Sequence, residues 1–160
     1  MKSTLAVAVL LAATAGASGG VTTFIVTLDG FQEVNAGGMP NQGDLDGSGI
    51  ATLMIDDSVS PPQIDWNFVV NGITLPLTLA HIHQAPAGSN GPVVVDFSAQ
   101  LSGSGLADAD LVNVLANPSN FYVNLHNVDF PGGALRGQIP APGSVALVAA
   151  AGLMGLRRRR

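Results

Sequence analysis

TTFIVTL, at residues 22–28, and QIDWNFVV, at residues 63–70, are the two stretches that decide the fold. Both alternate, so that every second side chain lies on the same face of an extended strand. In each stretch one such face is apolar. These apolar faces consist of Phe24, Val26 and Leu28 in the first stretch and Ile64, Trp66, Phe68 and Val70 in the second. Each stretch is therefore predicted to be a strand that buries one face against a second sheet.

Five further short runs, separated by Gly, Pro, Asn and Asp, extend the pattern of an all-β domain. They lie at residues 50–55, 77–83, 93–97, 121–126 and 135–139. About seven short strands in a small domain predict an antiparallel β-sandwich of the immunoglobulin or superoxide dismutase type. One short helix is expected at residues 108–116, where Asp108 or Asp110 can cap the N-terminus and Asn117-Pro118 end the helix.

Residues 1–17 have the layout of a secretory signal peptide. Lys2 supplies a positive charge, residues 5–13 are apolar, and Ala15-Gly16-Ala17 offers small residues for cleavage. The apolar run is too short to span a bilayer. We therefore expect the chain to be exported and this segment to be removed.

Residues 140–160 form a tail in three parts. These are Pro140, Ala141, Pro142 and Gly143, then an uncharged apolar stretch at residues 144–156, then Arg157, Arg158, Arg159 and Arg160. A helix over the apolar stretch would rise about 20 Å, against a hydrocarbon core of roughly 30 Å, so it would span only marginally, with the arginines on the cytoplasmic side. The layout resembles PEP-CTERM sorting signals. That resemblance implies cleavage by an exosortase-like membrane enzyme after transient anchoring, whereas an ordinary single-pass anchor is the alternative.

The domain between these ends, residues 20–139, is strongly acidic. The chain has 6 Lys and Arg and 11 Asp and Glu, but Lys2 and the four terminal arginines lie in the ends, which leaves Arg136. Such a charge argues against a nucleic-acid partner. Arg136 itself is expected to form a structural ion pair or a bidentate clamp, with Asp65 or Asp96 as the candidate carboxylates, and not to be catalytic. The chain has no cysteine, which excludes disulfides and thiolate chemistry.

The three histidines are the candidate metal ligands. His81 and His83 are two residues apart, so both rings lie on one face of a strand, and His126 ends another predicted strand. If those strands are neighbours in register, three imidazoles converge, which is enough to hold zinc or copper with water or a carboxylate as the fourth ligand. The alternative is structural: His81 and His126 would hydrogen-bond to the backbone or to Asp96 and Asn124.

Two acidic patterns fall short of a site. Asp44, Asp46 and Ser48 alternate as in a calcium loop, but Ile55 stands where such a loop needs a bidentate Glu, so a hairpin turn is favoured over calcium. The adjacent carboxylates at residues 56 and 57 point to opposite faces of a strand. With no nucleophile motif and a single Glu in the chain, we do not expect an enzyme.

Three segments, in this order, resemble the CHRD domain family of chordin and of bacterial exported proteins. They are LDGFQEV at residues 28–34 with GIATL at 49–53, AHIH at 80–83 with GSNGPVVV at 88–95, and FYVNLH at 121–126 with FPGGALRGQI at 130–139. The chain departs from the family pattern at Asn35 and Ala134, where a proline and an acidic residue are usual. The resemblance implies placement and architecture more than chemistry. Together with the two processing signals, it leads us to expect a non-enzymatic module of the cell surface or extracellular matrix that engages protein or polysaccharide through its loops. A metal-binding exported protein is the alternative.

Overall fold

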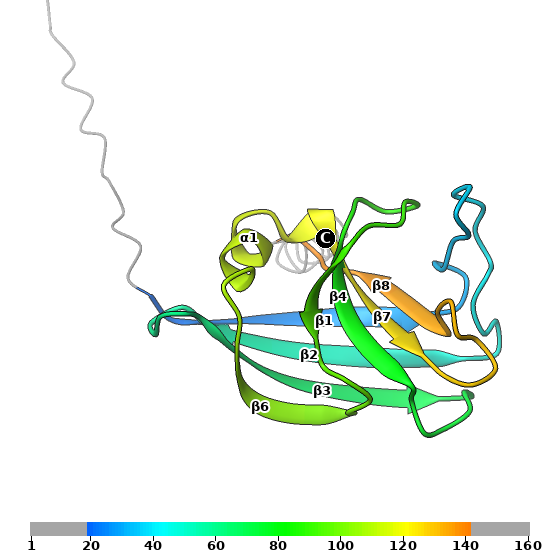
Figure 1. Cartoon of the computed structure of the whole chain (residues 1–160), viewed down its shortest axis with the longest axis horizontal. Helices are drawn as coiled ribbons and strands as arrows, with labels where there is room; N and C mark the ends of the chain where they lie inside the picture. The colour runs from blue at the N-terminus through cyan, green and yellow to red at the C-terminus, as the bar shows by residue number, and fades with distance from the viewer. Residues whose placement is uncertain (1–18, 142–160) are drawn as a thin grey trace, which may run out of the picture.

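A computed structural model describes residues 19–141 of the chain (Figure 1). The expected signal peptide at residues 1–17 lies outside the described residues, as does the tail from Pro142 onward. Within residues 19–141, no helix has the length and apolar character needed to cross a membrane.

Eight antiparallel strands form one sheet, in the order β5-β4-β7-β8-β1-β2-β3-β6. The strands are β1 (Val21–Asp29), β2 (Ser48–Asp56), β3 (Gln63–Asn71), β4 (Leu79–Gln84), β5 (Val93–Asp96), β6 (Ser102–Ala107), β7 (Phe121–His126) and β8 (Leu135–Gln138). Two short helical segments, α1 (Leu111–Ala116) and the 3-10 turn η1 (Pro118–Asn120), connect β6 to β7.

The sheet curls so that its two halves face each other across one core, which confirms the predicted all-β, sandwich-like class (Figure 1). The apolar face predicted for residues 22–28 is buried, and so are Ile64 and Phe68 of β3. Facing them are the buried apolar residues of the β4-β7 half. These include Ala80, Ile82, Val123 and Leu125.

Strand β6 was not predicted. Its sequence, SGSGLA, has small and polar residues where the predicted strands have alternating apolar ones, because β6 is an edge strand whose side chains contribute little to the core. It pairs with β3, where Gly103 lies opposite Trp66. A Cβ atom on Gly103 would collide with the Trp66 ring, so the absence of a side chain is what allows this pairing.

The helix is shorter than expected and begins at Leu111. Asp110 precedes it, but its carboxylate caps no backbone N–H of the helix and accepts only the side-chain amide of Asn113, at 3.3 Å. Instead, the Asp108 carboxylate accepts a bond from the Asp110 N–H at 2.9 Å. The aspartates therefore shape the turn before the helix, and the capping predicted for them is wrong.

The predicted turn at residues 43–49 covers the end of the connection between β1 and β2 and the first residues of β2, and the two strands pair along their whole length. The N–H of Gly47 donates to the Asp44 carbonyl at 3.1 Å, which closes the turn. The N–H of Asp44 donates to the carbonyl of Ala134, so this connection is tied to the segment that leads into β8.

Candidate metal centre

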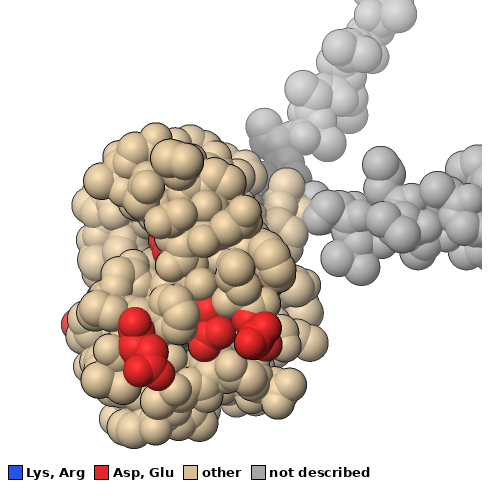
Figure 2. All heavy atoms as spheres, turned by 90° about the vertical axis from the view of Figure 1, so that its right-hand side faces the viewer, with Lys and Arg blue, Asp and Glu red and all other residues tan. Residues whose placement is uncertain are grey.

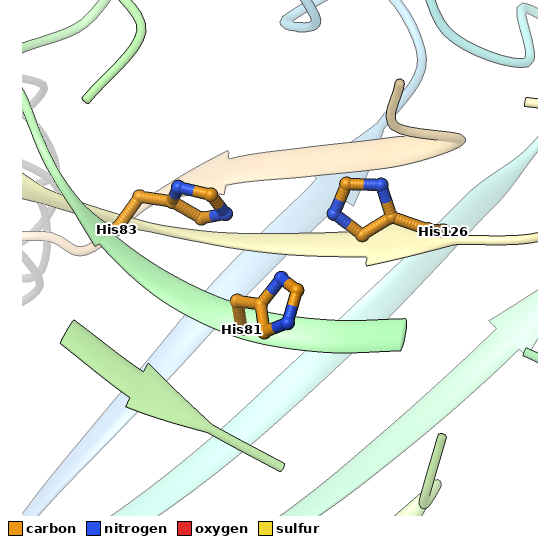
Figure 3. A group of neighbouring side chains, drawn as sticks. All are labelled: His81, His83 and His126. Atoms are coloured by element: carbon orange, nitrogen blue, oxygen red, sulfur yellow. The ribbon is translucent and has the colours of Figure 1, made fainter. Parts of the chain in front are cut away.

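The three histidines come together on the outer face of two neighbouring strands. Strands β4 and β7 pair so that His81 is opposite Asn124, His83 is opposite Tyr122 and His126 is opposite Leu79. Ile82, which points to the other face, is fully buried in the core. Figure 3 shows the three rings gathered over this part of the sheet. One nitrogen from each ring lies within 4.8 Å of the other two.

Backbone carbonyls fix the tautomers of two of the rings. His83 Nδ1 lies 2.9 Å from the Gly91 oxygen, and His126 Nδ1 lies 3.0 Å from the Pro131 oxygen. Because a carbonyl oxygen can only accept, each Nδ1 carries the proton and each Nε2 keeps a lone pair. Both Nε2 atoms are buried and have no hydrogen-bond partner.

His81 presents its other nitrogen to the cluster. Its Nε2 lies 3.7 Å from a carboxylate oxygen of Asp96, the residue paired with it on β5. Its Nδ1 is buried and has no partner. Each of the three rings therefore offers one buried, unpartnered nitrogen to a common centre. Leaving such an atom unsatisfied costs about 1–3 kcal/mol, a cost that a bound ion would remove.

Burial lowers the pKa of all three histidines below the usual value. For His83 the neighbouring histidines and Arg136 lower the pKa further, while for His81 the charge of Asp96 opposes the effect of burial. The rings are thus held in the neutral form, which is the form that binds metal ions.

A stack of side chains supports His83 from the side. The ring of Tyr122 lies parallel to that of His83 at 4.9 Å, and the Arg136 guanidinium lies 3.5 Å from the centre of the Tyr122 ring. Arg136 is 1 % exposed and donates to the Asn90 side chain at 3.1 Å and to the Ser89 carbonyl at 2.7 Å. The arginine therefore fastens the loop that contains Gly91, the partner of His83.

The ion pair predicted for Arg136 is wrong. In the described residues the guanidinium has no carboxylate within ion-pair distance, and its partners are an amide and carbonyls of residues 86–90. Asp96 lies beside His81, and Asp65 accepts the N–H of Gly105 at the edge of the sheet. Arg136 lies on β8 beneath the loop at residues 86–90, and no pattern in the sequence indicated that this loop folds over it.

Glu33 is a second buried ionisable group on this side of the sheet, at 2 % exposure. One carboxylate oxygen accepts the Val34 N–H, and the other is buried without a partner. Burial raises the pKa of Glu33, whereas the charge of Arg136 and the amide of Asn124 partly oppose that rise. Gly133, at φ +140°, packs against this carboxylate, where a Cβ atom would collide with it.

The sequence named the three ligands but not the groups that orient them. The carbonyls of Gly91 and Pro131, the ring of Tyr122 and the amide of Asn90 all lie in the segments that carry the family resemblance. That location was the available signal for them. The structural interpretation of the histidines is borne out for the His126 bond to the backbone and for the His81 contact with Asp96. These contacts use only the outer nitrogens and leave the inner ones open to a metal.

The CHRD domain model matches residues 24–139, which is most of the described chain and includes all three histidines. No curated protein and no solved structure matches the chain.

Proposed function

The chain belongs to the CHRD domain family, and from this premise we propose that it is an exported, non-enzymatic surface or matrix module that binds one transition-metal ion. The ligands are His81 Nδ1, His83 Nε2 and His126 Nε2, and the candidate ions are zinc and copper, both of which imidazole ligands suit.

The observation that carries the metal site is the set of three unpartnered nitrogens aimed at one another. A purely structural role for the histidines explains the bonds at Gly91 and Pro131 but leaves three buried lone pairs unsatisfied. Natural proteins seldom leave buried polar atoms without partners unless a ligand or ion supplies one.

The groups around the rings also match those of known metal sites in kind. Ligating histidines usually donate their other ring N–H to a carbonyl or a carboxylate, which fixes the ring and its tautomer. His83 and His126 each meet a carbonyl, and His81 faces a carboxylate.

The surface charge favours cations near the domain. All 11 acidic residues lie within the described part of the chain, and its one Lys or Arg side chain, Arg136, is buried. The end of the molecule in Figure 2 shows acidic side chains and no basic ones. Such a field raises the local concentration of cations.

The ends of the chain supply the rest of the proposal. The signal peptide at residues 1–17 would direct export, and the tail at residues 140–160 would be cut by an exosortase-like enzyme. The loops of the released domain would then engage a surface protein or polysaccharide. The support for binding by these loops is the resemblance of the chain to the CHRD family.

Elemental analysis of the exported protein, purified without a histidine tag from metal-replete medium, tests the metal site. We expect close to one zinc or copper per chain. The triple variant His81→Ala/His83→Ala/His126→Ala should lose that metal. The control Asp44→Ala/Asp46→Ala, which alters the turn once compared with a calcium loop, should keep it. A folded wild-type protein without metal would show that the histidines are structural.

A further inference from the structure

The charges around the three histidines bear on which ion they select. Resting on the metal site proposed above, we infer that the site is built for monovalent copper, Cu(I), held by three nitrogens, rather than for zinc or Cu(II).

The cluster lacks a fourth ligand. In the described part of the chain, the only converging group of three or more potential ligands is the histidine set itself. Asp96 cannot serve as the fourth ligand, because it lies beside His81 Nε2 and not beside Nδ1, the nitrogen that faces the cluster. The Asp96 side chain is also 61 % exposed. Glu33 does not belong to the converging group and already accepts the Val34 N–H. Zinc that is bound by three histidines completes its coordination with a water molecule, whereas Cu(I) forms stable complexes with three ligands.

Water is poorly placed to complete a zinc site. The three inner nitrogens are all shielded from solvent by the protein. A zinc or Cu(II) ion here would have to retain a water molecule or recruit an anion beside nitrogens that are shielded from solvent. Cu(I) needs neither.

The charged side chains near the histidines together compensate an ion of about one positive charge. Among residues 19–141, Asp96, on β5, has the only carboxylate oxygen within 4 Å of a histidine nitrogen. Glu33 and Arg136 are both buried and offset each other, and Arg136 acts as a positive charge on His83. All three ligands are neutral. The desolvation free energy of burying an ion rises with the square of its charge. Before nearby charges compensate it, this cost is therefore roughly four times as large for a divalent ion as for a monovalent one.

The geometry resists adjustment to other ions. Two of the rings are fixed by carbonyls from different loops, at Gly91 and Pro131, and His83 is also stacked on Tyr122. Cu(II) favours a square or tetragonal set of ligands, which three rings held in this way do not provide.

Paired affinity measurements on the exported full-length protein test the inference. Cu(I) affinity is measured without oxygen by competition with a chromophoric Cu(I) chelator, and zinc affinity by competition with a zinc chelator. We expect Cu(I) to bind at one per chain and to exceed zinc by at least about a thousandfold. X-ray absorption of the copper-loaded protein should show three nitrogen neighbours and no fourth ligand.

A charge variant separates the electrostatic argument from the general affinity of copper for nitrogen. Asn124 lies opposite His81 on the same face and is buried, so Asn124→Asp adds a carboxylate beside the cluster. The ratio of Cu(I) to zinc affinity should then fall at least tenfold. Asn67→Asp places the same charge on an exposed position of β3 and should leave the ratio unchanged.

The outcomes distinguish this inference from the proposal on which it rests. Zinc bound as tightly as Cu(I), or a fourth ligand on copper, would overturn the preference for Cu(I) but leave the metal site standing. An unchanged ratio in a folded Asn124→Asp protein would refute the charge argument, while the absorption data on the wild-type protein test the coordination separately. If neither metal binds, the metal site itself is wrong.

Discussion

Replacing Arg136 by methionine should destabilise the domain strongly, because this one side chain joins β8 to the loop at residues 86–90. Methionine keeps an apolar stem of similar length, so the variant removes mainly the guanidinium. The lost contacts are the bonds to Asn90 and Ser89 and the stacking on Tyr122.

The magnitude follows from those contacts. Hydrogen bonds from a charged donor contribute about 1.5–3 kcal/mol each, and a desolvated cation–π contact contributes about 2 kcal/mol. The cost of burying the guanidinium offsets part of this sum, and the variant also leaves Glu33 without its nearest compensating charge. We expect the free energy of unfolding to fall by about 3–5 kcal/mol, a large share of the stability of a small domain.

Urea denaturation of the metal-free protein measures this loss, with Trp66, the single tryptophan, as the fluorescent probe. Its ring contacts Phe97 in the core at 4.8 Å, so its emission should report unfolding. Arg136→Lys is the matched control. It keeps the charge but cannot bond to two acceptors in one plane, so its loss should be intermediate. A loss below about 1 kcal/mol for Arg136→Met would refute the reasoning, since an exposed polar contact would cost as much.

Three further predictions address pH, the sheet and the core. The three histidines have pKa values in the folded protein below their unfolded value of about 6.5, so the unfolded chain binds more protons in acid. Urea titrations of the metal-free protein should therefore show that the free energy of unfolding falls as the pH drops below about 6.5. A free energy of unfolding that does not change with pH in this range would contradict the burial of the histidines. Gly137→Ala should destabilise the domain by about 1–3 kcal/mol, because the new methyl group collides with the Thr27 carbonyl. The control Gly132→Ala has open space around it and should change stability by less than about 0.5 kcal/mol. Equal melting temperatures for the two variants would argue against the close approach of β8 to β1. Ile82→Val should lower the free energy of unfolding by about 0.5–1.5 kcal/mol in the same assay. It should not change the metal content, because Ile82 faces the core and not the histidines. A loss of metal would show that the two faces of β4 are coupled.

The strands could be predicted where one face of each is buried. Residues 22–28 and 63–70 alternate because their inner side chains pack in the core while their outer ones meet solvent. Strand β6 gave no such signal because an edge strand of Gly and Ser buries little. That the two halves form one continuous sheet could not be predicted either. The link between β1 and β8 is the single pair of Asp29 and Arg136, which are far apart in the chain.

The candidate site was predictable in part for a similar reason. The spacing of His81 and His83 places both on one face whatever the tertiary structure, because side chains alternate along a strand. The approach of His126 depends on the register between β4 and β7, which only the folded core determines. The partners of Arg136 depend on how a loop closes over β8, and no local pattern encodes that closure.

The hydrogen bond from His126 Nδ1 to the Pro131 carbonyl determines when, during synthesis of the chain, the histidine site can form. His81, His83 and Gly91 precede Pro131 in the chain, whereas the N-terminal strands β1, β2 and β3 contribute no ligand. A chain emerging from its N-terminus can therefore pair those three strands first, while the histidine pocket waits for residue 131. A nascent or truncated chain that stops at His126 contains every ligand, yet its last imidazole has no partner to set its tautomer. If the site binds a metal as proposed, its last ligand is therefore oriented by a residue that is synthesised after it.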